Sequence, residues 1–244
     1  MLTVYQREIA TFFSSLIGYI VIGLFLLVLG LFVWGFPGVN ILDGSYATLD
    51  PLFSIAPSIF TFLIPAITMR SFAEEQQTGT IELLLTRPIS DTGIVLGKFL
   101  SSWTLVLLAL LPTLVYFYAV SELGSPPGNL DSGAVWGSYL GLLLLGGVFT
   151  AIGIFASATT PNQIVAFLLG AFLCFVLYWA FFYLSQLPLF YGGLDRIIQE
   201  FGIDYHYDSI SRGLIDTRDL LYFFSVMVVF LSMTWMTLRR RKAG

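Results

Sequence analysis

The chain is 244 residues long, and 57% of its residues are hydrophobic while only 11% are charged. Its mean hydropathy is +0.87, whereas soluble domains carry charge on about a quarter of their residues, so the sequence predicts a polytopic membrane protein and excludes a soluble domain. The formal net charge is −4, and no basic patch exists beyond the last six residues, which excludes a nucleic-acid-binding surface.

The N-terminal segment, residues 1–15, predicts an amphipathic helix that lies in the membrane interface and leads into the first span. Its apolar residues recur at helical spacing, and they are Leu2, Tyr5, Ile9, Phe12 and Phe13. Its polar residues stand on the opposite side, and they are Gln6, Arg7 and Glu8. The alternative is that this helix simply extends the first span.

Six apolar runs are long enough for transmembrane helices, each of which needs about 20 residues. They predict an all-α, single-domain protein with spans at about residues 16–34, 52–69, 99–120, 134–156, 164–184 and 220–238. The second run is the weakest because it contains Pro51, Pro57 and Pro65. We expect a kink there, with neighbouring helices satisfying the carbonyls that the prolines leave free.

A polar segment, residues 71–90, separates the second and third runs and predicts two short helices. Ser71 stands three residues before Glu74, which is the spacing of a capping box. Gly79 is expected to break the first helix, and Thr80 to cap a second one that ends at Pro88. On that second helix, one face is formed by Ile81, Leu84 and Leu85, while Glu82 and Arg87 project away. The alternative is an ordinary solvated loop.

Further along the chain, Gly137 and Gly141 form a G-x-x-x-G pair in the fourth run. Small residues allow close approach of helices in lipid, so this pair predicts helix packing, either within the chain or against a second subunit. Residues 185–219 are too polar to cross the membrane, and they predict short interfacial or re-entrant helices. The segment 205–208 holds one His and one Asp, which is too few ligands for a metal site.

The sequence shows no pattern for binding a coupling ion or ATP, either of which could drive transport. Ion-driven carriers bind their ion at membrane depth, but the centres of the six runs contain no Asp, Glu, Lys, Arg or His. The run from Gly93 to Phe99 is one residue short of a phosphate-binding loop and ends without the Ser or Thr that binds magnesium. We therefore interpret Lys98 only as the cytoplasmic edge of the third span.

Orientation follows from the distribution of positive charge. With both termini in the cytoplasm, eight of the eleven Lys and Arg residues lie on the cytoplasmic side. Four of them form the tail Arg239–Lys242, directly after the last span. The loops 35–51 and 121–133 contain no Lys or Arg and are placed outside.

Residues 79–89, Gly-Thr-Ile-Glu-Leu-Leu-Leu-Thr-Arg-Pro-Ile, follow an acidic stretch and resemble the coupling region of the ABC-2 class of ABC transporter permeases. The resemblance implies a coupling helix that docks on a nucleotide-binding subunit. Its contact residues would be Glu74, Glu75, Gly79, Thr80, Glu82, Leu84, Leu85, Arg87 and Pro88. A second cytoplasmic contact is implied between spans four and five, at Thr159, Pro161 and Asn162.

Residues 65–75 and 211–223 resemble the gliding-motility-associated permease subunit GldF, and permeases of copper-enzyme maturation systems share much of the pattern. The resemblance implies the bacterial inner membrane, a separate ABC ATPase subunit that holds ATP and magnesium, and a second permease subunit with a large outer domain. It implies no cofactor in this chain, and it supplies neither a substrate nor a direction of transport.

These observations predict a non-catalytic permease subunit of an ATP-driven complex, associated with gliding motility or secretion. The main alternative is a membrane scaffold that anchors motility or secretion components, on which ATP drives mechanical work without transport. An ion-coupled carrier is disfavoured because the spans lack ionisable residues.

Overall fold

The computed structural model of the protein describes residues 1–38, 40–44, 46–82, 89–190 and 192–243. These residues are predominantly helical and contain no strand. Six of their helical segments are long and apolar enough to cross a membrane, namely Gly18–Gly35, Asp50–Gln77, Asp91–Leu123, Ser132–Thr159, Gln163–Ser185 and Thr217–Lys242. Each overlaps one predicted span, so the prediction of an all-α polytopic membrane protein is confirmed.

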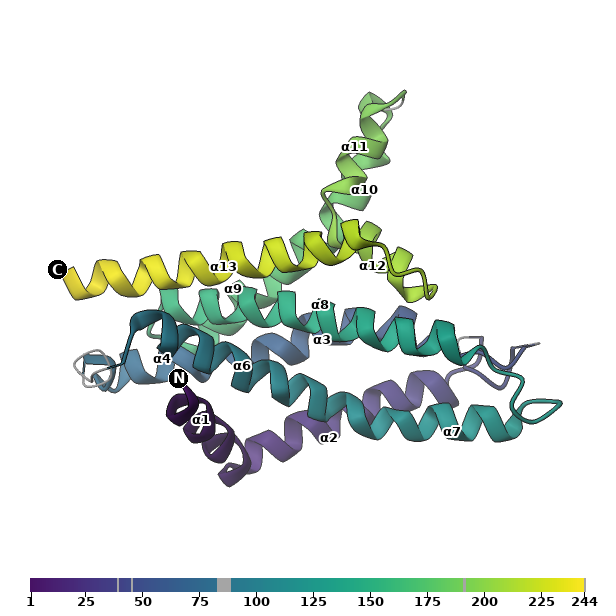
Figure 1. The fold of residues 1–244 in the computed structure, drawn as a ribbon, viewed down its shortest axis with the longest axis horizontal. Helices are drawn as coiled ribbons and strands as arrows, with labels where there is room; N and C mark the ends of the chain where they lie inside the picture. Colours follow the sequence, from purple (N-terminus) through teal and green to yellow (C-terminus); the bar gives the residue numbers. More distant parts are fainter. Residues whose placement is uncertain (39, 45, 83–88, 191, 244) are drawn as a thin grey trace.

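The helices follow one another along the chain as shown in Figure 1. The first half of the chain forms α1 (Leu2–Ser14), α2 (Leu16–Gly30), a π-helical turn (Leu31–Gly35), α3 (Asp50–Thr68), α4 (Arg70–Gln77), α6 (Asp91–Leu110), a 3₁₀ turn (Leu111–Thr113) and α7 (Leu114–Leu123). The second half forms α8 (Ser132–Thr159), α9 (Gln163–Phe175), a π-helical turn (Val176–Ala180), α10 (Phe181–Ser185), a 3₁₀ turn (Pro188–Phe190), α11 (Leu194–Glu200), α12 (Ile203–Ser211) and α13 (Thr217–Ala243).

Helix α8 is the centre of the bundle and packs against α3, α6, α9, α12 and α13. Glycines make this close packing possible because they let neighbouring side chains approach the helix backbone. A methyl group on Gly146 would lie 2.8 Å from Val106 Cγ1 of α6, and one on Gly153 would lie 2.1 Å from Thr68 Oγ1 of α3. The core is therefore arranged around the small residues of the fourth span.

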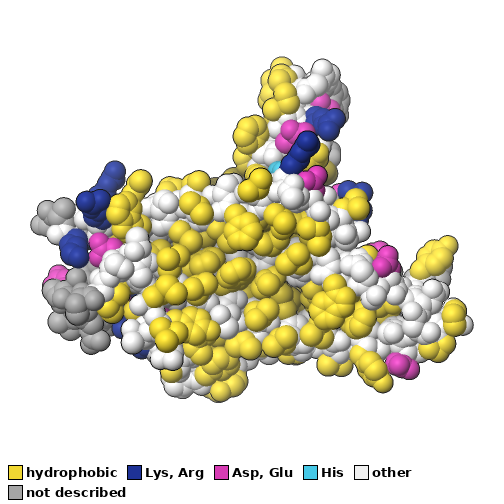
Figure 2. Space-filling view, in the orientation of Figure 1, with side chains coloured by type: hydrophobic (Ala, Val, Ile, Leu, Met, Phe, Trp, Pro, Cys, Tyr) yellow, Lys and Arg dark blue, Asp and Glu magenta, His cyan; other side chains and the backbone are white. Residues whose placement is uncertain are grey.

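The bundle has two ends that differ in charge. Both termini, α4 and the α8–α9 turn lie at one end, which we call the α4 end, and the last turn of α7 lies at the opposite end, the α7 end (Figure 1). Figure 2 shows hydrophobic side chains over the middle of one face, and Lys and Arg side chains at the α4 end and on the protruding helices. Helix α13 continues through Arg239–Lys242, so the basic tail is the last part of this helix.

The second span contains α3, which continues through Pro57 and Pro65. Proline cannot donate a hydrogen bond to the carbonyl four residues earlier. For Pro57 this is the carbonyl of Phe53, which accepts a hydrogen bond from the Tyr207 hydroxyl of α12 at 2.7 Å. A neighbouring helix thus satisfies the freed carbonyl, as predicted.

The segment between the fifth and sixth spans forms short helices, also as predicted. Figure 1 shows α10 and α11 standing out from the bundle, while α12 lies against it. Ile203, Tyr207 and Ile210 of α12 are buried. Methyl groups on Gly137 and Gly141 would lie within 3 Å of Gly213 and Ile210, respectively. Both glycines therefore serve packing within the chain, on a face that is already covered.

Candidate functional site

The candidate site is at the α4 end, where α4 meets the last turn of α8. Ser157 of α8 is fully buried, and its Oγ accepts hydrogen bonds from the backbone N–H groups of Phe72 at 2.9 Å and Ala73 at 3.0 Å. The same hydroxyl donates to the carbonyl of Met69 at 2.9 Å. Gln76 adds a hydrogen bond from Nε2 to the carbonyl of Ala158 at 3.0 Å. One serine therefore joins the fourth span to the start of α4.

This junction explains why α4 begins where it does. The first N–H groups of a helix lack partners within the helix, and a side chain that precedes the helix normally accepts from one of them. No residue before α4 does so. Ser157 instead performs this role from a different helix. The predicted capping box is consequently wrong: Ser71 lies inside α4, which starts at Arg70, and its side chain makes no capping hydrogen bond.

The junction carries an exposed surface, which we call the platform. Its first part comes from Glu74, Gln77 and the segment 78–80 with Glu82, all of which are exposed. Helix α4 ends at Gln77, and Gly79 adopts a φ of +70°, a backbone conformation that favours glycine. The predicted break at Gly79 is therefore confirmed. Ile81 is buried at 7% exposure, in keeping with its predicted apolar face.

The second part of the platform is the turn between α8 and α9. Thr159, Pro161 and Asn162 are exposed there. The Asn162 side chain accepts hydrogen bonds from the N–H groups of Ile164 at 2.9 Å and Val165 at 3.3 Å and so fixes the start of α9. The two regions that were predicted from the sequence to contact a partner, α4 with residues 78–82 and the α8–α9 turn, thus lie side by side. Leu84, Leu85, Arg87 and Pro88 lie outside the described residues.

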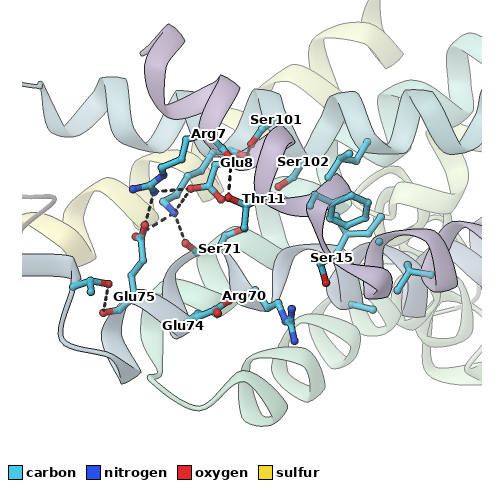
Figure 3. Close-up of a pocket in the computed structure, with 18 of the residues that line it drawn as sticks. Arg7, Glu8, Thr11, Ser15, Arg70, Ser71, Glu74, Glu75, Ser101 and Ser102 are labelled. Carbon is cyan, nitrogen blue, oxygen red and sulfur yellow. Dashed lines mark hydrogen bonds and ion pairs between the residues drawn. The ribbon is translucent and has the colours of Figure 1, made fainter.

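Beneath the platform lies an ion cluster formed by Arg7 and Glu8 of α1, Glu75 of α4 and Lys98 of α6. Lys98 Nζ is 2.9 Å from Glu8 Oε1 and 3.1 Å from Glu75 Oε2, and it also donates to the carbonyl of Ser71. Arg7 Nη2 is 2.7 Å from Glu8 Oε1 and 2.5 Å from Glu75 Oε1. Figure 3 shows Arg7 and Glu8 directed toward Glu75 across the gap between α1 and α4.

The cluster is balanced in charge and largely buried. The side chains of Lys98, Glu75 and Glu8 are 1%, 16% and 22% exposed, whereas that of Arg7 is 47% exposed. Burial raises the pKa of the Glu8 carboxyl, but the Lys98 and Arg7 charges and their hydrogen bonds lower it more, so this pKa lies below its ordinary value. The Glu8 carboxylate is therefore charged at neutral pH in the folded protein.

The cluster adds partners to residues that the sequence placed separately. Lys98 lies near the start of the third span, where it is an almost fully buried ion-pair partner. Glu75, predicted as a contact for the ATPase, forms ion pairs in this cluster and is 16% exposed, and its contact role stays a prediction. Helix α1 is separate from α2, as predicted, but Arg7 and Glu8 on its polar side bind protein groups. The sequence gives no local signal for this pairing, because Lys98 resembles an ordinary charge at the end of a span.

A cavity of about 330 Å³ adjoins the cluster. One part of its wall is polar and includes Arg70, Thr11 and Ser102, and another part is apolar and includes Phe12 and Ile67. Helix α1 is thus separated from α3 by open space on this side, and the contact between α1 and α4 is made at the rim by charged groups (Figure 3).

The histidine between the fifth and sixth spans has a structural role. His206 Nδ1 is 2.7 Å from Asp219 Oδ1, Nε2 is 2.9 Å from the carbonyl of Glu200, and the ring stacks on Tyr222 with centroids 3.9 Å apart. In the described part of the chain, no group of three His, Cys, Asp or Glu side chains could hold a metal ion. His206 instead joins α11 and α12 to the start of α13.

Comparison with known proteins agrees with this arrangement. The sequence profile of the family described as "ABC-2 family transporter protein" matches residues 5–189, which are 185 of the 244 residues. No curated protein matches the chain. Members of this family are multi-pass membrane subunits without catalytic activity, and the family implies an ABC ATPase as partner. The match spans α1 to α10 and includes the platform and the ion cluster, and the chain therefore belongs to the ABC-2 family of transporter proteins.

Proposed function

We propose that this chain is the permease subunit through which a separate ABC ATPase drives the membrane part of the transporter, and that the platform is the docking surface for the ATPase. The observation that carries the proposal is the Ser157 junction, which joins the two exposed contact regions into one unit. A push on either region is then delivered to both α3 and α8.

The mechanical path follows from the helices that the junction connects. Helix α4 continues almost directly from α3, with Met69 between them in a helical conformation. Helix α8 is the central element of the bundle. When ATP binding closes the partner ATPases, displacement of the platform would tilt both helices together. Interiors are close-packed, so such a displacement is passed on to neighbouring helices and not absorbed locally.

The orientation, the inner-membrane location and the second subunit are proposed from the sequence. The Lys and Arg residues gathered at the α4 end support placing the platform in the cytoplasm. The resemblance of residues 65–75 and 211–223 supports an inner-membrane complex associated with gliding motility or secretion. It also supports a second permease subunit with a large outer domain. ATP and magnesium belong to the partner ATPase.

Site-specific photo-cross-linking in membranes that contain the native complex tests the docking surface. A cross-linking residue is placed at Gln77 or Thr159 of the platform, and the matched control is placed at Asn129, an exposed residue at the α7 end. We expect the two platform positions to cross-link a protein that contains a phosphate-binding loop, and Asn129 not to do so. Equal cross-linking from Asn129, or none from the platform, would refute the proposal.

A charge reversal provides a second test of the same surface. Glu82 is exposed, and exposed substitutions usually change stability little. We expect Glu82→Lys to lower the stimulation of the partner's ATP hydrolysis by this subunit while its melting temperature stays unchanged. Unchanged stimulation in the assembled complex would show that Glu82 takes no part in docking.

A further inference from the structure

The ion cluster beneath the platform joins three helices that are distant in sequence. Lys98 has three ammonium protons and three oxygen neighbours: a carboxylate of α1, a carboxylate of α4 and a backbone carbonyl of α4. It donates hydrogen bonds to the Glu8 carboxylate and to the Ser71 carbonyl, and it forms an ion pair with the Glu75 carboxylate. Burying a lysine carries a desolvation penalty, which attraction to nearby carboxylates offsets.

The connection between α1 and α4 depends on these charges. Helix α1 packs closely on α6, where a methyl group on Gly97 would lie 3.0 Å from Val4 Cβ. Toward α4, in contrast, the two helices meet through side chains beside the cavity of about 330 Å³. Arg7 and Glu8 reach across to Glu75 and Lys98 at its rim. Apolar packing does not fill this space, so the ion pairs provide the link.

The ion pair between Lys242 and Asp91, also at the α4 end, differs from the ion cluster in its exposure to solvent. Lys242 Nζ lies 3.3 Å from Asp91 Oδ1, but its side chain is 50% exposed. Exposed pairs contribute little because water and salt screen them. Lys98 is 1% exposed and faces two carboxylates, so removing Lys98 alone leaves two largely buried carboxylates with only Arg7 as their counter-charge. The cluster therefore holds its three helices in a fixed arrangement that the exposed pair cannot impose.

We propose that Lys98 is a positioning residue of the coupling step: with Arg7, Glu8 and Glu75 it holds α1, α4 and the start of α6 as one body, so that α1 moves with the platform when the ATPase acts. The inference rests on the proposed function, because it needs a platform that moves. It adds the N-terminal helix to the moving parts, whereas docking alone involves only α4 and the α8–α9 turn.

The test measures two distances between spin labels in the assembled complex, without nucleotide and trapped with ATP and vanadate. The distance from Gln77 to Asn129 reports whether α4 moves relative to the α7 end. The distance from Ala10 to Gln77 reports whether α1 follows α4. All three positions are exposed, and the native cysteine, Cys174, is buried. In the wild type, we expect the first distance to change by about 2 Å or more and the second to stay constant.

The principal variant is Lys98→Met combined with Glu75→Gln. It removes one charge of each sign and leaves the Arg7–Glu8 pair within α1, so no buried charge loses its compensation. We expect the distance between Ala10 and Gln77 to broaden and to change with ATP in this variant. Lys98→Arg, which retains the charge, should restore the wild-type behaviour, and Lys242→Met is the matched control that should change nothing.

The outcomes separate the two proposals. If α4 does not move relative to the α7 end on trapping with ATP in the wild type, the proposed function fails. If α4 moves and the distance from Ala10 to Gln77 changes with it in the wild type, the docking function of the platform is retained. The positioning role of Lys98 is then wrong. The role is also wrong if the double variant keeps that distance constant.

Discussion

Replacing Ser157 with alanine tests the junction that carries the proposed function. The substitution removes a single oxygen atom from a fully buried position. That oxygen accepts from two backbone N–H groups and donates to one carbonyl, with distances of 2.9 to 3.0 Å. Alanine leaves these groups without a partner at a place that water does not reach. We therefore expect the start of α4 to lose its attachment to α8.

The size of the effect follows from the groups left unsatisfied. Each buried polar group without a partner costs about 1–3 kcal/mol, and partial relaxation of α4 recovers some of this, so the junction should weaken by about 2–4 kcal/mol. Local opening of α4 would then become roughly 30 to 1,000 times more frequent, because about 1.4 kcal/mol corresponds to a factor of ten.

Hydrogen exchange measured by mass spectrometry on the purified protein checks this expectation. Peptides that cover residues 70–77 should exchange faster in Ser157→Ala by the factor given above, while peptides from the middle of α8 keep their protection. The matched control is Ser225→Ala, which removes an exposed hydroxyl that donates to the Tyr222 carbonyl and should leave α4 unchanged. Wild-type protection of residues 70–77 in Ser157→Ala would refute the reasoning.

Three further predictions concern other parts of the fold. Gly153→Ala should lower the melting temperature strongly, because its methyl group would lie 2.1 Å from Thr68 Oγ1. Adding Thr68→Ala to this variant should partly restore the melting temperature. Gly23→Ala is the control and should have no such effect, because no atom lies within 4 Å of the added methyl group. The pKa of the Glu8 carboxyl is lower in the folded protein than its ordinary value of 4.5. Its stabilising contribution should therefore be present above pH 4.5 and be lost as the pH falls through the folded pKa. Glu8→Gln should remove this part of the acid dependence of unfolding. His206→Phe keeps the ring but loses two hydrogen bonds, and it should speed hydrogen exchange in α11 and α12 by about tenfold or more; unchanged exchange would show that the His206 contacts do not hold these helices.

Much of the fold followed from hydrophobicity because a bilayer imposes a strict requirement. A spanning segment must be apolar and must satisfy its own backbone, so a run of about 20 apolar residues has few alternatives to a helix. The prolines of the second span were also informative, since each one frees a known carbonyl. What the sequence could not identify was the donor for that carbonyl, because Tyr207 lies 154 residues away from Phe53.

The functional site was only partly predictable. Gly79 and the exposed residues around it belong to a local pattern of capping and breaking, which short stretches of sequence encode. The Ser157 junction and the ion cluster have no local signature. Ser157 is one serine in an apolar helix, and Lys98 and Glu75 resemble ordinary charges at the end of a span. Their roles depend on partners contributed by other helices.

The sequence alone determined that the protein is helical, that it has six spans, and that a polar segment interrupts them after the second. These properties depend on composition and on local spacing, and both can be read along the chain. Only the tertiary structure decided which charges face solvent and which are buried. Glu8 and Lys98 lie 90 residues apart along the chain, and helix packing brings Lys98 Nζ to 2.9 Å from Glu8 Oε1. The pairing of charges depends on distance in space, which a single sequence does not specify.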